Sequence, residues 1–121
     1  MLWQRVEGAI VFLAGLGLFL QTQTGLAWWI VIAIFFVPDI SVAAYLLGRK
    51  VGAFGYNLVH IYAFGAALYV IGLISGLPLI VATGALWLAH SGFDRMLGYG
   101  LKSTEGFSVT HLGKIGRPLR E

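Results

Sequence analysis

Four ionisable side chains within apolar stretches of the sequence are of types that could do chemistry. Asp39, His60 and His90 each lie about nine residues, or about 13 Å at the rise of an α-helix, from the expected cytoplasmic end of their helix. Asp94 follows His90 by one helical turn on the same helix face. A charge or a histidine among lipid tails is costly unless it is buried and paired, so such residues are functional candidates. Their common depth predicts one polar centre.

Two imidazoles and two carboxylates on facing helices are a ligand set typical of metal sites in helical bundles. Such nitrogen and oxygen donors suit zinc, iron or manganese. The same groups could instead carry protons as acids and bases, with Arg95 holding an anionic substrate. Asp94 could also act indirectly, by orienting His90 through a hydrogen bond. A hydrogen-bonded core that only holds the helices in register is the structural alternative.

The spacing of these residues does not identify a particular metal enzyme. The chain has no His-Glu-x-x-His motif, no repeated Glu-x-x-His motif and no dense group of histidines. Convergence of the Asp39, His60 and His90 side chains within about 5 Å would favour a metal or another ligand. Side chains that point outward, or that are each capped by one local partner, would favour the structural alternative.

Six further side chains are expected to line or cover the centre. They are Glu7, Tyr56, Asn57, Trp87, Tyr99 and His111. Tyr56 shares a helix face with His60, and Trp87 shares one with His90, so both rings should face protein and not lipid. For His60, a hydrogen bond to a neighbouring residue of its own helix is the alternative to a role as a ligand.

The composition identifies an integral membrane protein. Of the 121 residues, 59% are hydrophobic and 11% are charged, and the mean hydropathy is +0.86. A soluble domain carries roughly 25% charged residues. Residues 51–93 contain no Asp, Glu, Lys or Arg, which is long enough for two membrane-spanning helices of roughly 20 residues each. The absence of cysteine excludes disulfides and thiolate chemistry.

We expect an all-α fold, a polytopic membrane protein built as an antiparallel bundle of four transmembrane helices. The helices should span residues 3–20, 26–47, 51–74 and 77–99, in a single domain of residues 1–121 with a basic cytoplasmic tail over about 100–121. Pro38 should kink the second helix, and Pro78 should begin the fourth. The 17 glycines should mostly serve close packing within the bundle.

All eight basic residues lie on one side of this topology, and the two loops on the opposite side carry none. The positive-inside rule then places both termini in the cytoplasm, which predicts a multi-pass protein of the bacterial inner (cytoplasmic) membrane. Topology also explains the net charge of +3, so no nucleic-acid partner is expected. Each helix contributes an ionisable group to the cytoplasmic half, which predicts a cavity open toward the cytoplasm.

The tail from Gly106 to Glu121 is basic, and contact with acidic lipid headgroups is its simplest role. If the tail folds under the bundle, His111 could cap the cavity. Arg95 could bind an anionic lipid or a small anionic ligand that enters from the cytoplasmic side. The expected partners are therefore the lipid bilayer, such an anion, and a homo-oligomer or a larger membrane complex.

Several short motifs occur together along nearly the whole chain. They are Pro38-Asp39-x-Ser41, Tyr45-x-x-Gly48, Gly52, Tyr56-Asn57-x-x-His60-x-Tyr62, His90-x-Gly92-Phe93-Asp94-Arg95, Gly98-Tyr99-Gly100-Leu101-Lys102, Gly106-Phe107 and Thr110-His111-Leu112-Gly113. In this combination the chain resembles a small bacterial integral membrane family of unknown function, domain-of-unknown-function family 4260. The resemblance implies a stand-alone four-helix bacterial membrane protein, and it transfers no catalytic role to any residue.

Three classes of function fit these observations. The first is a membrane enzyme that depends on a divalent metal or on acid–base chemistry at Asp39, His60, His90 and Asp94. The second is a binding or transport-accessory protein whose cavity holds a lipid, a quinone or a small anion. The third is an accessory subunit of a membrane complex in which the polar cluster is purely structural. The sequence alone leaves open whether the protein is an enzyme and whether a metal is its cofactor.

Overall fold

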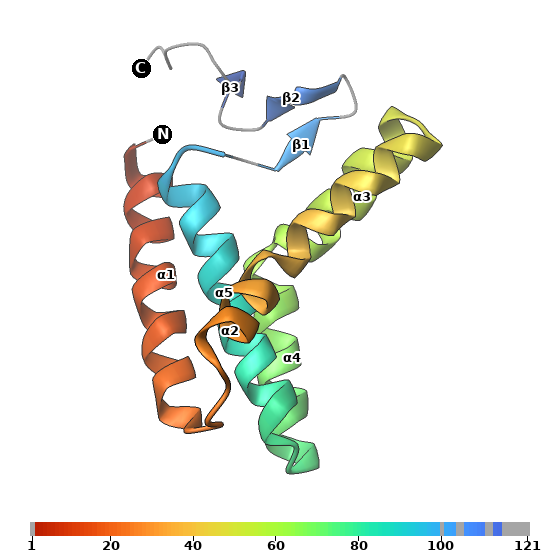
Figure 1. The fold of residues 1–121 in the computed structure, drawn as a ribbon. Helices are drawn as coiled ribbons and strands as arrows, with labels where there is room; N and C mark the ends of the chain where they lie inside the picture. Colours follow the sequence, from red (N-terminus) through yellow and green to blue (C-terminus); the bar gives the residue numbers. More distant parts are fainter. Residues whose placement is uncertain (1, 100, 104–105, 111–112, 115–121) are drawn as a thin grey trace.

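The structure is a computed structural model that describes residues 2–99, 101–103, 106–110 and 113–114. Helices make up its main body (Figure 1). They are α1 (Leu2–Thr22), α2 (Trp28–Phe36), the 3₁₀-helix η1 (Val37–Leu47), α3 (Arg49–His60), α4 (Tyr62–Ser75) and α5 (Pro78–Met96). Three short strands follow, β1 (Lys102–Ser103), β2 (Gly106–Thr110) and β3 (Gly113–Lys114).

The central element is α5, which packs between α1 and α4 and also contacts α2 and η1. Small residues make these contacts close. A Cβ atom added at Gly92 would meet the backbone of α1 at Phe12 and Gly8, and one added at Gly84 would meet the backbone of α4 at Tyr69. Small side chains let membrane helices approach each other in this way. These glycines therefore serve packing within the fold, as expected from the sequence.

The second expected helix changes its winding at Pro38. The α-helix α2 ends at Phe36, and η1 continues as a 3₁₀-helix of 11 residues with the buried Pro38 at its start. Proline has no N–H to donate to the preceding turn, and 3₁₀ runs longer than about four residues are uncommon. Asp39 lies in this first turn of η1. The proline thus places Asp39 on an element with unusual winding.

The third expected helix, residues 51–74, is not continuous. It is divided at Ile61, whose backbone is extended (φ −75°, ψ 148°), and α3 and α4 are bent by 50° relative to each other. Neither proline nor glycine stands at this position, so local sequence did not predict the break. Two side chains of α5 bond backbone carbonyls at this break. The break makes His60 the last residue of a helix.

The fourth helix ends at Met96, three residues before the expected end. The N–H of Tyr99 donates to the Asp94 carbonyl at 2.9 Å, and the N–H of Gly98 donates to the Arg95 carbonyl at 3.0 Å. With Gly98 at φ +91°, these two bonds form the Schellman motif that ends many helices. Asp94 and Arg95 consequently belong to the last turn of α5.

The tail contains a small antiparallel sheet that the sequence did not predict. Its strand order is β1-β2-β3, with Lys102 opposite Thr110 and Val109 opposite Lys114. The first two strands contact α3, and the sheet lies at the end of the molecule where α1 begins and α5 ends (Figure 1). Such short strands carry little signal of their own, because pairing across the sheet stabilises them.

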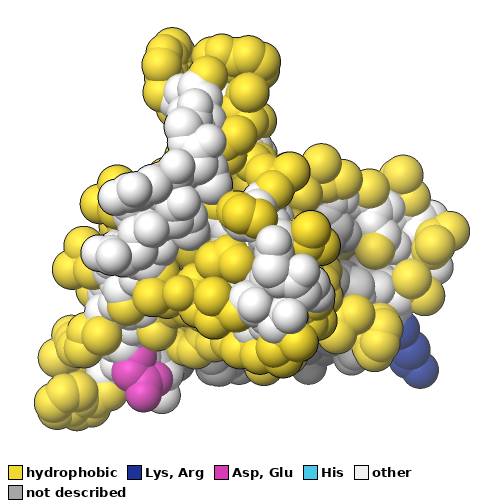
Figure 2. All heavy atoms as spheres, turned by 90° about the horizontal axis from the view of Figure 1, so that it is seen from below, with side chains coloured by type: hydrophobic (Ala, Val, Ile, Leu, Met, Phe, Trp, Pro, Cys, Tyr) yellow, Lys and Arg dark blue, Asp and Glu magenta, His cyan; other side chains and the backbone are white. Residues whose placement is uncertain are grey.

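Several of the helices are apolar enough to cross a membrane. Leu2–Thr22 and Trp28–Leu47 qualify by length and composition, and α3 with α4 forms a third candidate if the bent pair is counted as one span. In α5 the last two turns carry His90, Asp94 and Arg95, which lower its hydropathy. Figure 2 shows a face covered largely by hydrophobic side chains, with charged atoms visible only near its margins. Exposed apolar side chains also lie along the helices themselves, among them Ile10, Leu13 and Trp29, and such a surface is suited to contact with lipid.

Candidate functional site

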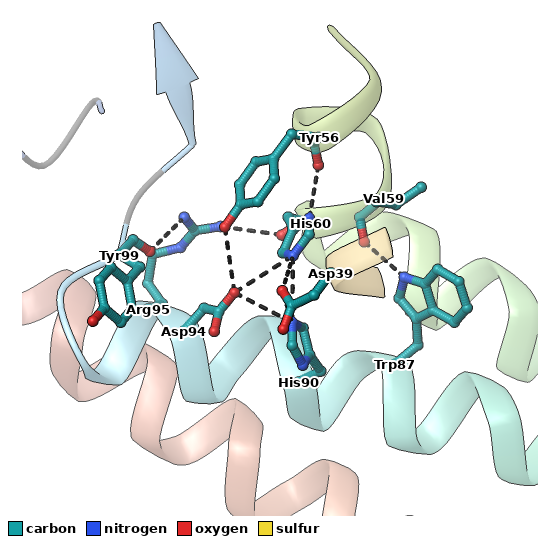
Figure 3. A network of polar contacts seen from close by, with 9 residues as sticks. All are labelled: Asp39, Tyr56, Val59, His60, Trp87, His90, Asp94, Arg95 and Tyr99. Atoms are coloured by element: carbon teal, nitrogen blue, oxygen red, sulfur yellow. Dashed lines mark hydrogen bonds and ion pairs between the residues drawn. The ribbon is translucent and has the colours of Figure 1, made fainter. Parts of the chain in front are cut away.

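The four expected side chains converge on one point. Asp39 comes from η1, His60 from α3, and His90 and Asp94 from α5 (Figure 3). Each residue offers one nitrogen or oxygen atom, and these atoms all lie within 4.8 Å of one another. The His60 and His90 side chains are only 2% and 1% exposed, and Asp94 is 15% exposed. The polar centre inferred from helix depth and spacing is therefore present in the fold.

The distances within this centre have a regular pattern. His60 Nε2 lies 3.4 Å from Asp39 Oδ1 and 3.5 Å from Asp94 Oδ2. His90 Nε2 lies 3.1 Å and 3.3 Å from the same two oxygens, and 3.3 Å from His60 Nε2. In a tetrahedron with metal–ligand bonds of about 2.0–2.1 Å, neighbouring ligand atoms are about 3.3–3.4 Å apart. Five of the six ligand–ligand distances thus agree with tetrahedral coordination.

His60 is oriented by a bond to the backbone of its own helix. Its Nδ1 lies 2.8 Å from the Tyr56 carbonyl oxygen, and the Tyr56 ring stacks on the imidazole with the two ring centres 3.8 Å apart. Because a carbonyl oxygen only accepts, Nδ1 must carry the hydrogen. Neutral His60 then presents the lone pair of Nε2 to the centre. Metal-binding histidines are commonly held by this kind of bond.

His90 is held by packing. Its ring contacts Phe35 and Phe36 edge-on, with ring centres 5.2 Å and 6.0 Å apart. Its Nδ1 is buried and has no hydrogen-bond partner in the described part of the chain. The aromatic pair from α2 therefore fixes the plane of the ring, and Nε2 faces the centre. Sequence reasoning missed these two phenylalanines, since an aromatic residue in an apolar helix carries no distinguishing signal.

The break between α3 and α4 is stabilised by two side chains of α5. Trp87 Nε1 donates to the Val59 carbonyl at 2.7 Å, and Arg95 Nη2 donates to the His60 carbonyl at 3.2 Å. The last carbonyls of a helix have no partner within the helix, so they need such donors where water is excluded. Trp87 therefore caps the break beside the centre.

Arg95 and Tyr56 extend the polar network on one side of the centre. The guanidinium of Arg95 also reaches the Tyr99 carbonyl at 3.5 Å and lies 5.4 Å from the centre of the Tyr62 ring. The Tyr56 hydroxyl donates to Asp94 Oδ2 at 3.5 Å. Tyr62 was not expected at the site, although it follows His60 closely in the sequence.

The other side chains that the sequence predicted to line the centre differ in where they lie. Glu7 is an exposed residue of α1, and the Asn57 carbonyl accepts the N–H of Ile61 at the break. Tyr99 takes part through its backbone carbonyl, as the acceptor from Arg95. His111 lies outside the described residues. Their role as lining residues stays a prediction.

The centre is open at Asp39, whose side chain is 46% exposed. Two cavities of 320 Å³ and 460 Å³ lie elsewhere, around the C-terminal half of α1, with Leu18 and Leu20 among their lining residues. These cavities do not correspond to the cavity expected at the polar centre. Asp39 is the most exposed of the four ligand residues.

Comparison with known proteins gives one match. A family model described as "Domain of unknown function (DUF4260)" matches residues 1–115. No curated protein and no solved structure matches the chain.

Proposed function

Because the chain belongs to the DUF4260 family, which is described only as a domain of unknown function, we propose its function from the geometry of the polar centre. The protein binds a divalent metal ion through Asp39 and Asp94 oxygens and the Nε2 atoms of His60 and His90. The observation that carries this proposal is the set of five ligand–ligand distances between 3.1 and 3.5 Å. Each is close to the edge of about 3.3–3.4 Å of a tetrahedron around a metal ion, and the sixth edge, between the two carboxylates, is within 4.8 Å.

With neutral rings, hydrogen bonds account less well for the same contacts, and with both rings protonated two cations would lie 3.3 Å apart. With Nδ1 of His60 donating to a carbonyl, Nε2 of the neutral ring has no hydrogen to give to Asp39 or Asp94. Nε2 of His90 can donate to one of its three neighbours only. Several lone pairs would then face each other without a hydrogen between them. A cation at the centre of the four atoms is attracted to all of them.

The donor set suits zinc, iron or manganese. The sixth distance, between the two carboxylate oxygens, is within 4.8 Å. A value near that limit would make the four atoms four corners of an octahedron, with two positions left for other ligands. Structural zinc sites are closed, whereas catalytic sites keep a position for water or substrate. The half-exposed Asp39 leaves this centre open on one side. This supports a centre that receives an external ligand, as in a metal-dependent membrane enzyme.

We place the centre in the cytoplasmic membrane, in a bundle of four spans formed by α1, α2 with η1, α3 with α4, and α5. The chain direction alternates between these segments in Figure 1, and the η1–α3 junction lies toward the end where α1 starts. Arg5 in α1 and Arg49 at that junction support an orientation with both termini in the cytoplasm. The broken span is compatible with lipid because side chains bond its freed carbonyls.

Metal content of the purified protein tests the proposal. Elemental analysis should find about one transition-metal ion per chain, lost when His60→Ala and His90→Ala are combined. Trp87→Phe is the matched control, because it removes a bond at the same break without removing a ligand. Metal-free native protein that adding zinc, iron or manganese does not stabilise would overturn the proposal. That result would favour a centre that only holds the helices in register.

A further inference from the structure

Arg95 is a buried cation without a carboxylate partner in the described part of the chain. Arg95 is 7% exposed, and among the described residues its guanidinium bonds only to the carbonyls of His60 and Tyr99. A guanidinium has five N–H donors, so most of them stay available. The C-terminal end of α5 supplies only partial negative charge to this cation. A buried charge that is not paired with an opposite charge is costly.

The charge of the proposed metal centre does not neutralise Arg95. In that centre the carboxylates of Asp39 and Asp94 balance a divalent ion, while the two histidines are neutral ligands. The positive charge of Arg95 is therefore not balanced by a described carboxylate when the metal is bound. An anion that lies close to both the metal ion and the Arg95 guanidinium would neutralise this charge.

A second donor faces the same side of the centre. The Tyr56 hydroxyl lies 3.5 Å from Asp94 Oδ2, a long contact that it can exchange for a better acceptor. Figure 3 shows this hydroxyl and the Arg95 guanidinium directed toward the same side of Asp94. The Tyr56 ring is held independently by its stacking on His60. The two groups thus form a fixed pair of donors next to the metal ligands.

We propose that Arg95 and the Tyr56 hydroxyl form an oxyanion subsite that takes a phosphate group, with another oxygen of that group on the metal ion. The inference rests on the proposed function. A guanidinium binds phosphate through two parallel bonds, and a tetrahedral phosphate has oxygens left for a metal and a hydroxyl. The phosphate group belongs to a lipid headgroup or to a soluble compound that reaches the last turn of α5 by displacing neighbours of Arg95, which is 7% exposed.

Binding of two probes to the metal-loaded protein in detergent tests the subsite. The first is inorganic phosphate and the second is a short-chain phosphatidic acid, both titrated by calorimetry. Arg95→Gln should weaken binding by about 10- to 100-fold, the effect of losing charge-assisted hydrogen bonds. Tyr56→Phe, which keeps the ring stacked on His60, should weaken it by about 2- to 10-fold.

Arg5→Gln is the matched control. Arg5 also donates to a backbone carbonyl at this end of α5, that of Met96 at 3.0 Å, but it is not bonded to the centre. Binding in this variant should equal that of the native protein. Binding of inorganic phosphate indicates a soluble compound, whereas binding of phosphatidic acid alone indicates a lipid headgroup, and either result supports the subsite.

Metal content is measured on the same samples, so the two proposals can fail separately. A protein that holds its metal but binds neither probe overturns the subsite and leaves the metal centre intact. If the Arg95→Gln variant binds either probe as tightly as the native protein, the subsite is likewise overturned and the metal centre is left intact. If Arg95→Gln does not fold, unchanged binding by Tyr56→Phe overturns the subsite. A protein that takes up no metal overturns both proposals.

Discussion

Substitution of Gly92 by alanine tests how the contact between α1 and α5 supports the site. Gly92 lies between His90 and Asp94 on α5, on the part of that helix that packs against α1. A Cβ atom at this position would come within 2.7 Å of the Gly8 carbonyl oxygen and 2.9 Å of the Val11 carbonyl carbon, and closer still to the Phe12 nitrogen.

The expected loss of stability in Gly92→Ala follows from these distances. Ordinary contacts begin at 3.4 Å, and all three neighbours are backbone atoms that cannot rotate away. The two helices must therefore separate by roughly 1 Å, and overpacking of this kind costs about 1–3 kcal/mol. Alanine favours a helix over glycine by about 0.8–1.0 kcal/mol, which offsets part of that cost. Because three backbone atoms are met at once, the cost should lie in the upper part of that range, about 2–3 kcal/mol, which leaves a net loss of about 1–2 kcal/mol in the free energy of unfolding.

Thermal unfolding in detergent, together with metal content, measures the effect. One kcal/mol corresponds to about 3–5 °C for a chain of this size, so the midpoint should fall by about 3–10 °C. Gly17→Ala in α1 is the control, because nothing lies within 4 Å of its added Cβ and its helix should gain stability. If Gly92→Ala unfolds no earlier than the native protein and binds its metal equally well, the reasoning about this interface is wrong.

Three further results are expected. Removing the metal with a chelator should lower the unfolding midpoint, because an ion at 100 times its dissociation constant stabilises the folded state by about 2.7 kcal/mol; an unchanged midpoint would contradict a bound ion. Asp39→Asn and Asp94→Asn should each weaken metal binding at least about tenfold in a competition titration, since each replaces an anionic ligand, and native affinity in both variants would exclude these carboxylates as ligands. Trp87→Phe should lower the free energy of unfolding by about 1–2 kcal/mol without loss of metal, because the Val59 carbonyl loses its 2.7 Å bond; equal stability in chemical or thermal unfolding would show that this bond does not hold the break.

The polar centre was predictable because helices place residues at known depths and on known faces. His90 and Asp94 are separated by four residues, so any helix brings them together. Asp39 and His60 belong to other segments, and they could be assigned to the same centre because they are expected at the same depth as His90. Arg95 was also identified, as a group that could hold an anionic substrate, but its bond to the His60 carbonyl could not be inferred from the sequence.

The sequence by itself determined the apolar helices, the interruption at Pro38 and the set of four converging residues. These features follow from local properties: hydrophobicity, the missing N–H of proline and the periodicity of the α-helix. Only the tertiary structure decided where the third expected helix breaks and how His60 is turned. The bonds that hold the break join residues 28 and 35 positions apart in the chain, from Trp87 to Val59 and from Arg95 to His60. Since those partners are supplied by another helix, the break and the four-atom geometry exist only once α5 has packed beside α3 and α4.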